Sequence, residues 1–177
     1  MTDGRQPLSD RPRGTARGGV PDDEVRAAWS RWLGTLRTRG RDPSPVLRPG
    51  AAPSAIAAAE QAVGFALPDP VRAVYALTDG QADPAQVGGP TLFPARVFCP
   101  LRRAGELAGE REMVGRWPLG EGDDGLLLVG ADGRVLGADD REIAADLVDY
   151  LGLLSVADLQ DVGSAAGTTG WDVPDLR

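Results

Sequence analysis

The sequence predicts an α+β domain in which N-terminal helices pack with a small antiparallel sheet and a C-terminal helix. Apolar residues recur at helical spacing in the first half of the chain, short apolar runs alternate with glycine turns after it, and helical spacing then returns. With 177 residues and 42% hydrophobic residues, the chain can bury the core of one domain. We expect a disordered leader over residues 1–20, the domain over 21–160 and a flexible tail over 161–177.

The segment 21–40 predicts the first helix. Its apolar side chains share one face, and its ends carry acidic residues first and arginines last, as the helix dipole favours. The residues expected to face the core are Val25, Trp29, Trp32, Leu33 and Leu36. Residues 53–64 predict a second, alanine-rich helix that stops at Gly64.

Residues 69–79 predict a third helix with a signal at each end. We expect Asp69 to cap it and Pro70 to take the first helical position, where a missing N–H costs nothing. Gly80 would close the helix in the left-handed conformation. Asp79 would then lie at the C-terminal end, where the dipole disfavours a negative charge, so its loss should be mild or even stabilising.

The sheet is expected from short apolar runs, with a helix between the first two. Residues 97–101, 113–120 and 125–130 predict strands, and residues 103–113 predict the helix. Asp132-Gly133 separates two apolar runs and matches a type I′ hairpin turn.

A last helix is expected after the hairpin. Asp139 and Glu142 match a capping box at its start, and Asp146 and Asp149 fall on its outer side. Its inner face would carry Ile143, Leu147, Tyr150, Leu151 and Leu154.

The composition excludes several kinds of catalysis. The chain has no histidine, and all 19 of its basic residues are arginine, so it lacks a Ser-His or Cys-His pair, a lysine Schiff base and the P-loop lysine. Its single cysteine, Cys99, lies in an apolar run and is expected in the core, and one thiol is no metal site. The aspartate-rich segment 120–135 lacks the spacing and the closing glutamate of an EF-hand calcium loop, so we expect no metal, and we expect no cofactor. A carboxylate hydrolase that uses Glu121 with Asp123 or Asp124 stays open as an alternative.

Charge is concentrated in the last third of the chain. Residues 119–177 hold three arginines and thirteen acidic residues, a net charge of −10, which disfavours nucleic acid and would attract a basic protein. A solvated surface that only aids solubility is the simpler alternative. The expected partner contacts are Glu121, Asp123, Asp124, Asp139, Asp140, Asp146 and Asp149, with Trp117 or Trp171 as an aromatic anchor.

The sequence also predicts a cytoplasmic location and no membrane partner. Its longest apolar run falls well short of the roughly 20 residues that span a bilayer. The N-terminus is rich in arginine and lacks the apolar run of a secretory signal. One cysteine cannot form an internal disulfide, which agrees with a reducing compartment.

Residues 53–81, PSAIAAAEQAVGFALPDPVRAVYALTDGQ, resemble the signature of the SUKH superfamily, which contains the fungal Smi/Knr cell-wall synthesis regulators and many bacterial immunity proteins. The matching positions are Ile56, Glu60, Gly64, Leu67, Pro68, Arg72, Tyr75, Asp79 and Gly80. Family members more often carry Asn-Gly where this chain has Asp79-Gly80. The tryptophan helix before the signature, and LFP, WPLG and DGRV after it, extend the resemblance over roughly residues 22–157.

The resemblance implies a non-enzymatic binding domain. Its bacterial members are commonly immunity proteins that bind and neutralise toxins, and its fungal members are scaffolds in cell-wall signalling. The family has no agreed catalytic set, so the resemblance assigns no catalytic residue. The expected function is therefore an immunity protein that binds a cognate toxin, with a regulatory scaffold as the alternative.

Overall fold

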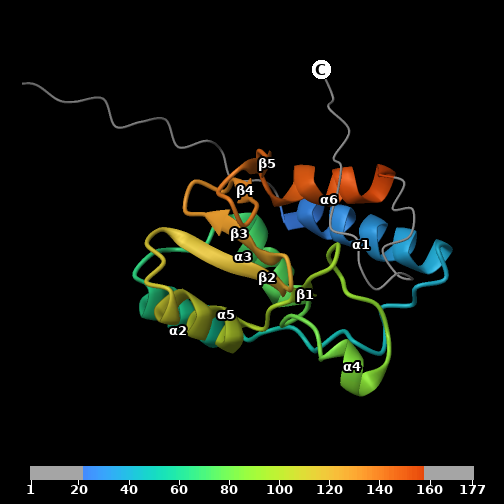
Figure 1. Ribbon diagram of the computed structural model, residues 1–177, viewed down its shortest axis with the longest axis horizontal. Coiled ribbons are helices and arrows are strands. Elements are labelled where there is room, and N and C mark those ends of the chain that lie inside the picture. Colours follow the sequence, from blue (N-terminus) through green and yellow to red (C-terminus); the bar gives the residue numbers. More distant parts are fainter. Residues whose placement is uncertain (1–21, 158–177) are drawn as a thin grey trace, which may run out of the picture.

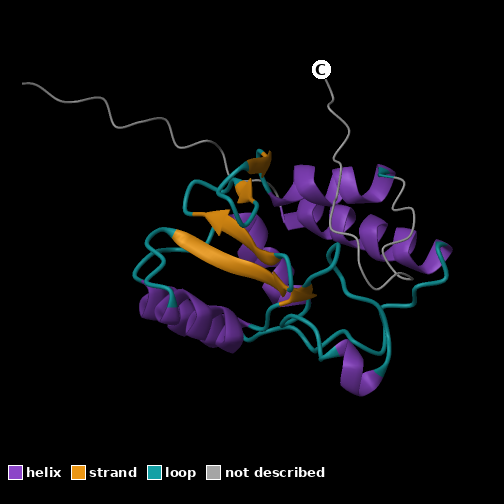
Figure 2. Ribbon diagram, viewed as in Figure 1, coloured by secondary structure: helices purple, strands orange, loops and turns teal. Residues whose placement is uncertain are grey.

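The computed structural model describes residues 22–157 and shows the expected α+β fold (Figures 1 and 2). The leader expected over 1–20 and the tail expected over 161–177, with Trp171, lie outside the described residues. The helices of the described part are α1 (Asp22–Thr38), α2 (Pro53–Val63), α3 (Asp69–Leu77), α4 (Pro84–Val87), α5 (Leu101–Glu110) and α6 (Leu147–Val156). Its strands are β1 (Val97–Phe98), β2 (Arg116–Gly122), β3 (Gly125–Gly130), β4 (Val135–Leu136) and β5 (Glu142–Ala144).

Helices cover both faces of the antiparallel sheet, whose strands lie in the order β1-β2-β3-β4-β5. Figure 1 shows α2 and α5 together on one side of the sheet, and α1 beside α6 on the other. The helix α3 packs against α1. The central strands are buried on both faces, which explains why residues 126–129 are continuously apolar rather than alternating with polar residues.

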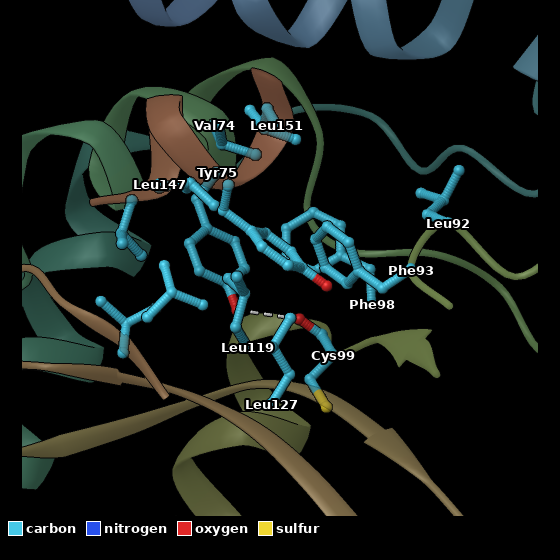
Figure 3. Packing of buried hydrophobic residues seen from close by; sticks show 14 of the residues in the cluster. Val74, Tyr75, Leu92, Phe93, Phe98, Cys99, Leu119, Leu127, Leu147 and Leu151 are labelled. Carbon is cyan, nitrogen blue, oxygen red and sulfur yellow. Dashed lines mark hydrogen bonds between the residues drawn. The ribbon is translucent and has the colours of Figure 1, made fainter. Parts of the chain in front are cut away.

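Residues 75–81 and residues 98–101 form one seam that joins the end of α3 to β1 and α5. The buried Tyr75 hydroxyl donates to the Cys99 carbonyl at 2.9 Å (Figure 3). The main chain of Gln81 donates to the Phe98 carbonyl at 3.0 Å, and its side-chain oxygen accepts from the Phe98 N–H at 2.9 Å. The helical and sheet parts of the core are therefore tied together by hydrogen bonds as well as by apolar packing.

The ends of α3 differ from the expectation. Asp69 is the first helical residue and makes no side-chain cap, while the helix stops at Leu77 and Thr78 is extended with φ −155°. Asp79 thus lies beyond the helix, and its carboxylate accepts a 2.8 Å hydrogen bond from the N–H of Leu101, the first residue of α5. The expectation that Asp79 is unfavourably placed is wrong, because it serves the N-terminus of a different helix.

The β3–β4 hairpin is present, but its turn is not type I′. The Gly133 N–H bonds to the Gly130 carbonyl at 2.8 Å, and the positive φ falls on Gly133 (+92°) and not on Asp132. The pattern is that of a three-residue loop closed by a left-handed residue. Strands β3 and β4 pair through Leu128 with Leu136 and Val129 with Val135, so the pairing starts beyond a loop longer than two residues.

The β4–β5 turn repeats this geometry. The Asp140 N–H bonds to the Gly137 carbonyl at 3.1 Å, and Asp140 has φ +63°. The sequence repeats as well, since GADGRVL at 130–136 is followed directly by GADDREI at 137–143. Each seven-residue unit supplies one turn and one short strand.

The capping box expected from Asp139 and Glu142 is also wrong. Glu142 lies in β5, and α6 begins five residues later at Leu147. The cap is Asp146, whose carboxylate accepts from the Asp149 N–H at 2.9 Å. The helix face expected to be buried is confirmed for Leu147, Tyr150, Leu151 and Leu154.

Gly80 and Gly64 offer a matched test of the seam. Both have positive φ, +68° and +77°, but a Cβ on Gly80 would lie 2.4 Å from the Pro100 nitrogen, whereas one on Gly64 would meet open space. Gly64→Ala should lower the free energy of unfolding by about 1 kcal/mol. Gly80→Ala adds a backbone clash and should cost about 2 to 4 kcal/mol. Urea melts measure both, and equal losses would show that the seam yields to an added methyl group.

Asp79→Ala should lower the free energy of unfolding by about 1 kcal/mol, because the Leu101 N–H would lose its partner. The control is Asp123→Ala, which removes an exposed carboxylate that has no ion pair within residues 22–157. Thermal melts should separate the two variants. A neutral or stabilising Asp79→Ala would return this residue to the role expected from the sequence.

Candidate functional site

Four of the expected partner contacts lie at one end of the sheet, in the β2–β3 and β4–β5 turns. The antiparallel register turns the chain between Gly122 and Gly125, and the next turn at the same end follows Leu136. The two turns touch, since a Cβ on Gly125 would lie 2.6 Å from the Cβ of Ala138. We call these four residues the acidic end: Asp123, Asp124, Asp139 and Asp140.

Asp146 and Asp149 are not part of the acidic end. Ala144 pairs with Val135, so β5 leads the chain toward the opposite end of the sheet before α6 begins. Asp146 is half-buried and occupied as the α6 cap, while the Asp149 side chain is exposed. The acidic residues expected to act as one surface are therefore divided between two places.

Trp117 cannot act as a surface anchor, and that expectation is wrong. Its side chain is fully buried, and its indole N–H donates to the Tyr75 hydroxyl at 3.1 Å. The two rings meet edge to face with centroids 6.1 Å apart. The physical reason is that β2 is a central strand with helices on both faces, so its tryptophan fills the core.

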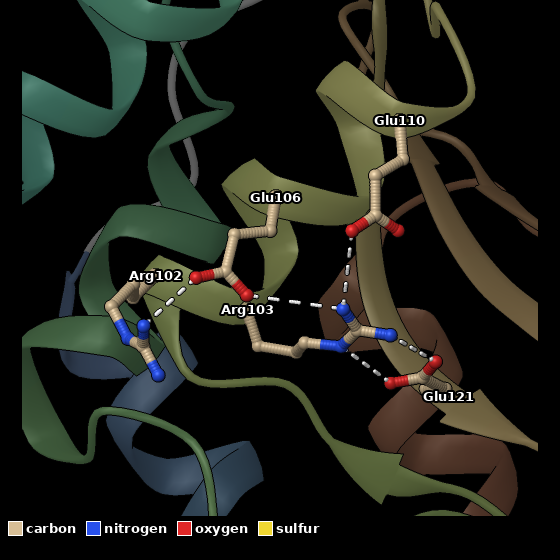
Figure 4. Close-up of polar contacts among 5 residues, drawn as sticks. All are labelled: Arg102, Arg103, Glu106, Glu110 and Glu121. Atoms are coloured by element: carbon tan, nitrogen blue, oxygen red, sulfur yellow. Dashed lines mark hydrogen bonds and ion pairs between the residues drawn. The ribbon is translucent and has the colours of Figure 1, made fainter.

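Glu121 joins β2 to α5 rather than facing a partner. Its two carboxylate oxygens accept from the Arg103 guanidinium at 3.0 and 2.8 Å (Figure 4). Arg103 also lies 3.8 Å from Glu106 and 3.7 Å from Glu110 on its own helix. The hydrogen bonds from Arg103 lower the pKa of Glu121, because they favour its charged form.

Two carboxylates of the acidic end are paired with arginines from other parts of the chain. Asp124 lies 2.7 Å from Arg96, whose side chain is only 13% exposed and also donates to the main-chain carbonyl of Gly125 at 3.3 Å. Asp140 lies 2.7 Å from Arg116. These pairs hold the two turns and partly neutralise their charge.

Asp123 and Asp139 are the most available carboxylates of the acidic end. Both are exposed, and neither forms an ion pair within residues 22–157. One oxygen of Asp139 accepts from the Arg141 N–H at 3.3 Å, which fixes the direction of its side chain. A partner can reach both carboxylates without breaking an existing ion pair.

The arrangement does not suit acid–base chemistry at the expected carboxylates. A general acid needs a raised pKa, but Arg103 lowers the pKa of Glu121. Burial raises the pKa of the Cys99 thiol to about 12, so this thiol stays protonated and is a poor nucleophile at neutral pH. Within the described residues, no three acidic or cysteine side chains are grouped to hold a metal ion.

Three polar residues that sequence analysis did not single out make long-range contacts that hold the site in place: Gln81, Arg96 and Arg103. The buried Gln81 side chain joins a loop to β1, and the two arginines fix Asp124 and Glu121. Gln81 directly follows Asp79-Gly80 in the segment that resembles the SUKH signature, and this position could have indicated its importance. The sequence contains no such indication for Arg96 and Arg103, since their partners are 28 and 18 residues away along the chain.

The comparisons with known proteins leave the family open. No protein-family model matches the chain, and none of the curated proteins matches it. Between residues 22 and 157, the structure contains no helix with the length and apolar character that crossing a membrane requires.

The Arg103–Glu121 pair predicts a dependence of stability on pH. Because folding lowers the pKa of Glu121, the pair stabilises the fold at neutral pH, and this contribution is lost as the pH falls below the ordinary glutamate value of 4.5. Glu121→Gln should therefore cost up to about 1 kcal/mol at pH 7, since both side chains are over a third exposed, and much less near pH 3.

Urea melts of wild type and Glu121→Gln at the two pH values measure this difference. Asp123→Asn is the control, because it makes the same chemical change at an exposed carboxylate, and its effect should be small at both values. A Glu121→Gln cost that does not change with pH would show that the ion pair contributes nothing through its charge.

Proposed function

We propose that the chain is a non-catalytic protein-binding domain that neutralises a cognate toxin by covering a basic surface on it. The first support is that residues carrying the SUKH resemblance have structural roles in this fold. Glu60 accepts from the Leu67 N–H at 3.0 Å, Asp79 accepts from the Leu101 N–H, and Gly80 fits closely against Pro100. These residues build the fold, which leaves function to exposed surfaces.

The observation that carries the proposal is the exposed and supported acidic end. Asp123 and Asp139 are exposed on two touching turns, and Arg96 ties one of these turns to the chain before β1. Turns that are already ordered lose little conformational freedom on binding. A toxin that acts on nucleic acid presents a basic groove, and fixed carboxylates can occupy such a groove in place of phosphates.

The same contacts favour binding over the carboxylate hydrolase. Glu121 is paired with Arg103 and Asp124 with Arg96, so the use of either carboxylate in catalysis would first break an ion pair. Nucleic acid is disfavoured as the partner because its phosphates would be repelled by the acidic end. We place the protein in the cytoplasm, where a buried, reduced Cys99 is stable and where a toxin acting on nucleic acid would be met.

The proposal predicts that a gene beside this one in the source genome encodes a toxin, and a neighbourhood without such a gene would count against it. The test is co-expression of the chain with the toxic domain of that protein. The chain should restore growth and bind the purified domain, and the association rate should fall about tenfold or more between roughly 50 and 300 mM salt. Asp123→Arg with Asp139→Arg should slow association about tenfold, while the melting temperature changes little because both side chains are exposed.

Asp149→Arg is the matched control, since it reverses an exposed acidic residue away from the acidic end. It should change the association rate much less. Binding without growth rescue would support the regulatory scaffold instead of an immunity protein. If the chain neither binds the domain nor restores growth, the proposed function is wrong.

A further inference from the structure

We propose that residues 81–92, here called the α4 loop, form a second contact that inserts into an uncharged recess of the same protein partner. The inference rests on the proposed function and adds what the acidic end does not provide, which is recognition of shape. Figure 1 shows α4 projecting from the body of the molecule, away from the sheet. None of the residues of α4 is buried, so the helix adds little to the core.

The base of the α4 loop is clamped by one buried side chain. Gln81 is 2% exposed, and its side-chain oxygen accepts from the Leu92 N–H at 2.8 Å while its NH₂ donates to the Pro90 carbonyl at 3.3 Å. The same oxygen accepts from the Phe98 N–H in β1. Both ends of the loop are therefore held together and fixed to the sheet, as in compact loops that carry binding functions.

The projecting part is ordered by its own hydrogen bonds. The Asp83 carboxylate accepts from the Ala85 N–H at 2.9 Å, and the Gly88 N–H bonds to the Pro84 carbonyl at 3.0 Å. Gly88 has φ +70°, which ends the single helical turn. A loop that is ordered while exposed presents a defined convex shape and loses little conformational entropy when a partner covers it.

The chemistry of the loop indicates the surface that it fits. Asp83 is the only charged residue among residues 81–92, although 25% of the chain is charged, and its carboxylate already caps the helical turn. Val87 is 49% exposed. Depletion of charge around an exposed apolar side chain is typical of the centre of a protein interface. The matching surface is thus a concave, uncharged recess that accepts a valine.

The α4 loop and the acidic end are connected through residues 93–96. Phe93 bonds to Arg96 across a turn that directly follows the loop, and Arg96 is the arginine that pairs with Asp124. The turn also touches the β2–β3 hairpin, because a Cβ on Gly122 would lie 2.2 Å from the Ala95 carbonyl oxygen. One partner surface can therefore meet both, with charge guiding approach to the acidic end and the α4 loop slowing release.

The test compares Val87→Ser with Val114→Ser, using as the probe the toxin domain chosen for the growth-rescue test above. Val114 is the control because it is 91% exposed and lies between α5 and β2, outside the α4 loop. Val87→Ser should raise the dissociation constant about fivefold or more, through a faster dissociation rate that does not depend on salt. Val114→Ser should stay within about twofold of wild type.

A second variant tests the whole loop by replacing residues 84–89 with two glycines. It should melt close to wild type, since these residues include no buried one, and it should release the probe much faster. If wild type binds and Val87→Ser binds equally well, the α4 loop lies outside the interface and this inference is wrong. If wild type does not bind the probe, the proposed function itself fails.

Discussion

The seam between residues 75–81 and residues 98–101 is the constraint on which the rest of the structure depends. It brings the end of α3, the first strand and the start of α5 to one place, through Tyr75, Asp79 and Gln81. Each of these side chains bonds to main-chain atoms, so the position of the backbone itself is fixed. The sheet then carries α5 on one face and leaves the other for α1, α3 and α6. This arrangement also determines where the acidic end and the α4 loop lie.

Features that depend on local periodicity were predictable from the sequence, and features that depend on partners far away along the chain were not. The helices α1 and α2, the strand β3 and the left-handed Gly64 at the end of α2 follow from spacing and from the special freedom of glycine. Gly80 has a positive φ as expected, but it does not close α3, because the helix ends at Leu77 and Thr78 is its cap. The role of Asp79 could not be predicted because its partner, Leu101, is 22 residues away, and no local rule connects them. The Asp-Gly pair at 132–133 is typical of a two-residue loop, but the structure has a three-residue loop there.

The charge of the candidate site could not be predicted from the sequence either, because it also depends on distant partners. Counting charges along the chain gives a strongly acidic last third, but folding brings Arg96, Arg103 and Arg116 from earlier segments onto its carboxylates. A net charge computed by segment therefore overstates the field that a partner meets. The burial of Trp117 could not be predicted for a similar reason. The residues around it have the same pattern whether they form a central strand or an exposed one.

The repeated turn builds this side of the sheet from two similar units. Residues 130–136 and 137–143 each contain one turn that is followed by one short strand. The number of strands on this side of the sheet therefore depends on the number of seven-residue units. The limit comes from α6, which must start close enough to the last unit to reach α1. Because each unit reverses the direction of the chain, a third unit would leave the chain at the acidic end, which is the wrong end of the sheet for α6 to pack on α1 as it does here. Whether the number of units is odd or even thus decides at which end of the sheet the last helix starts.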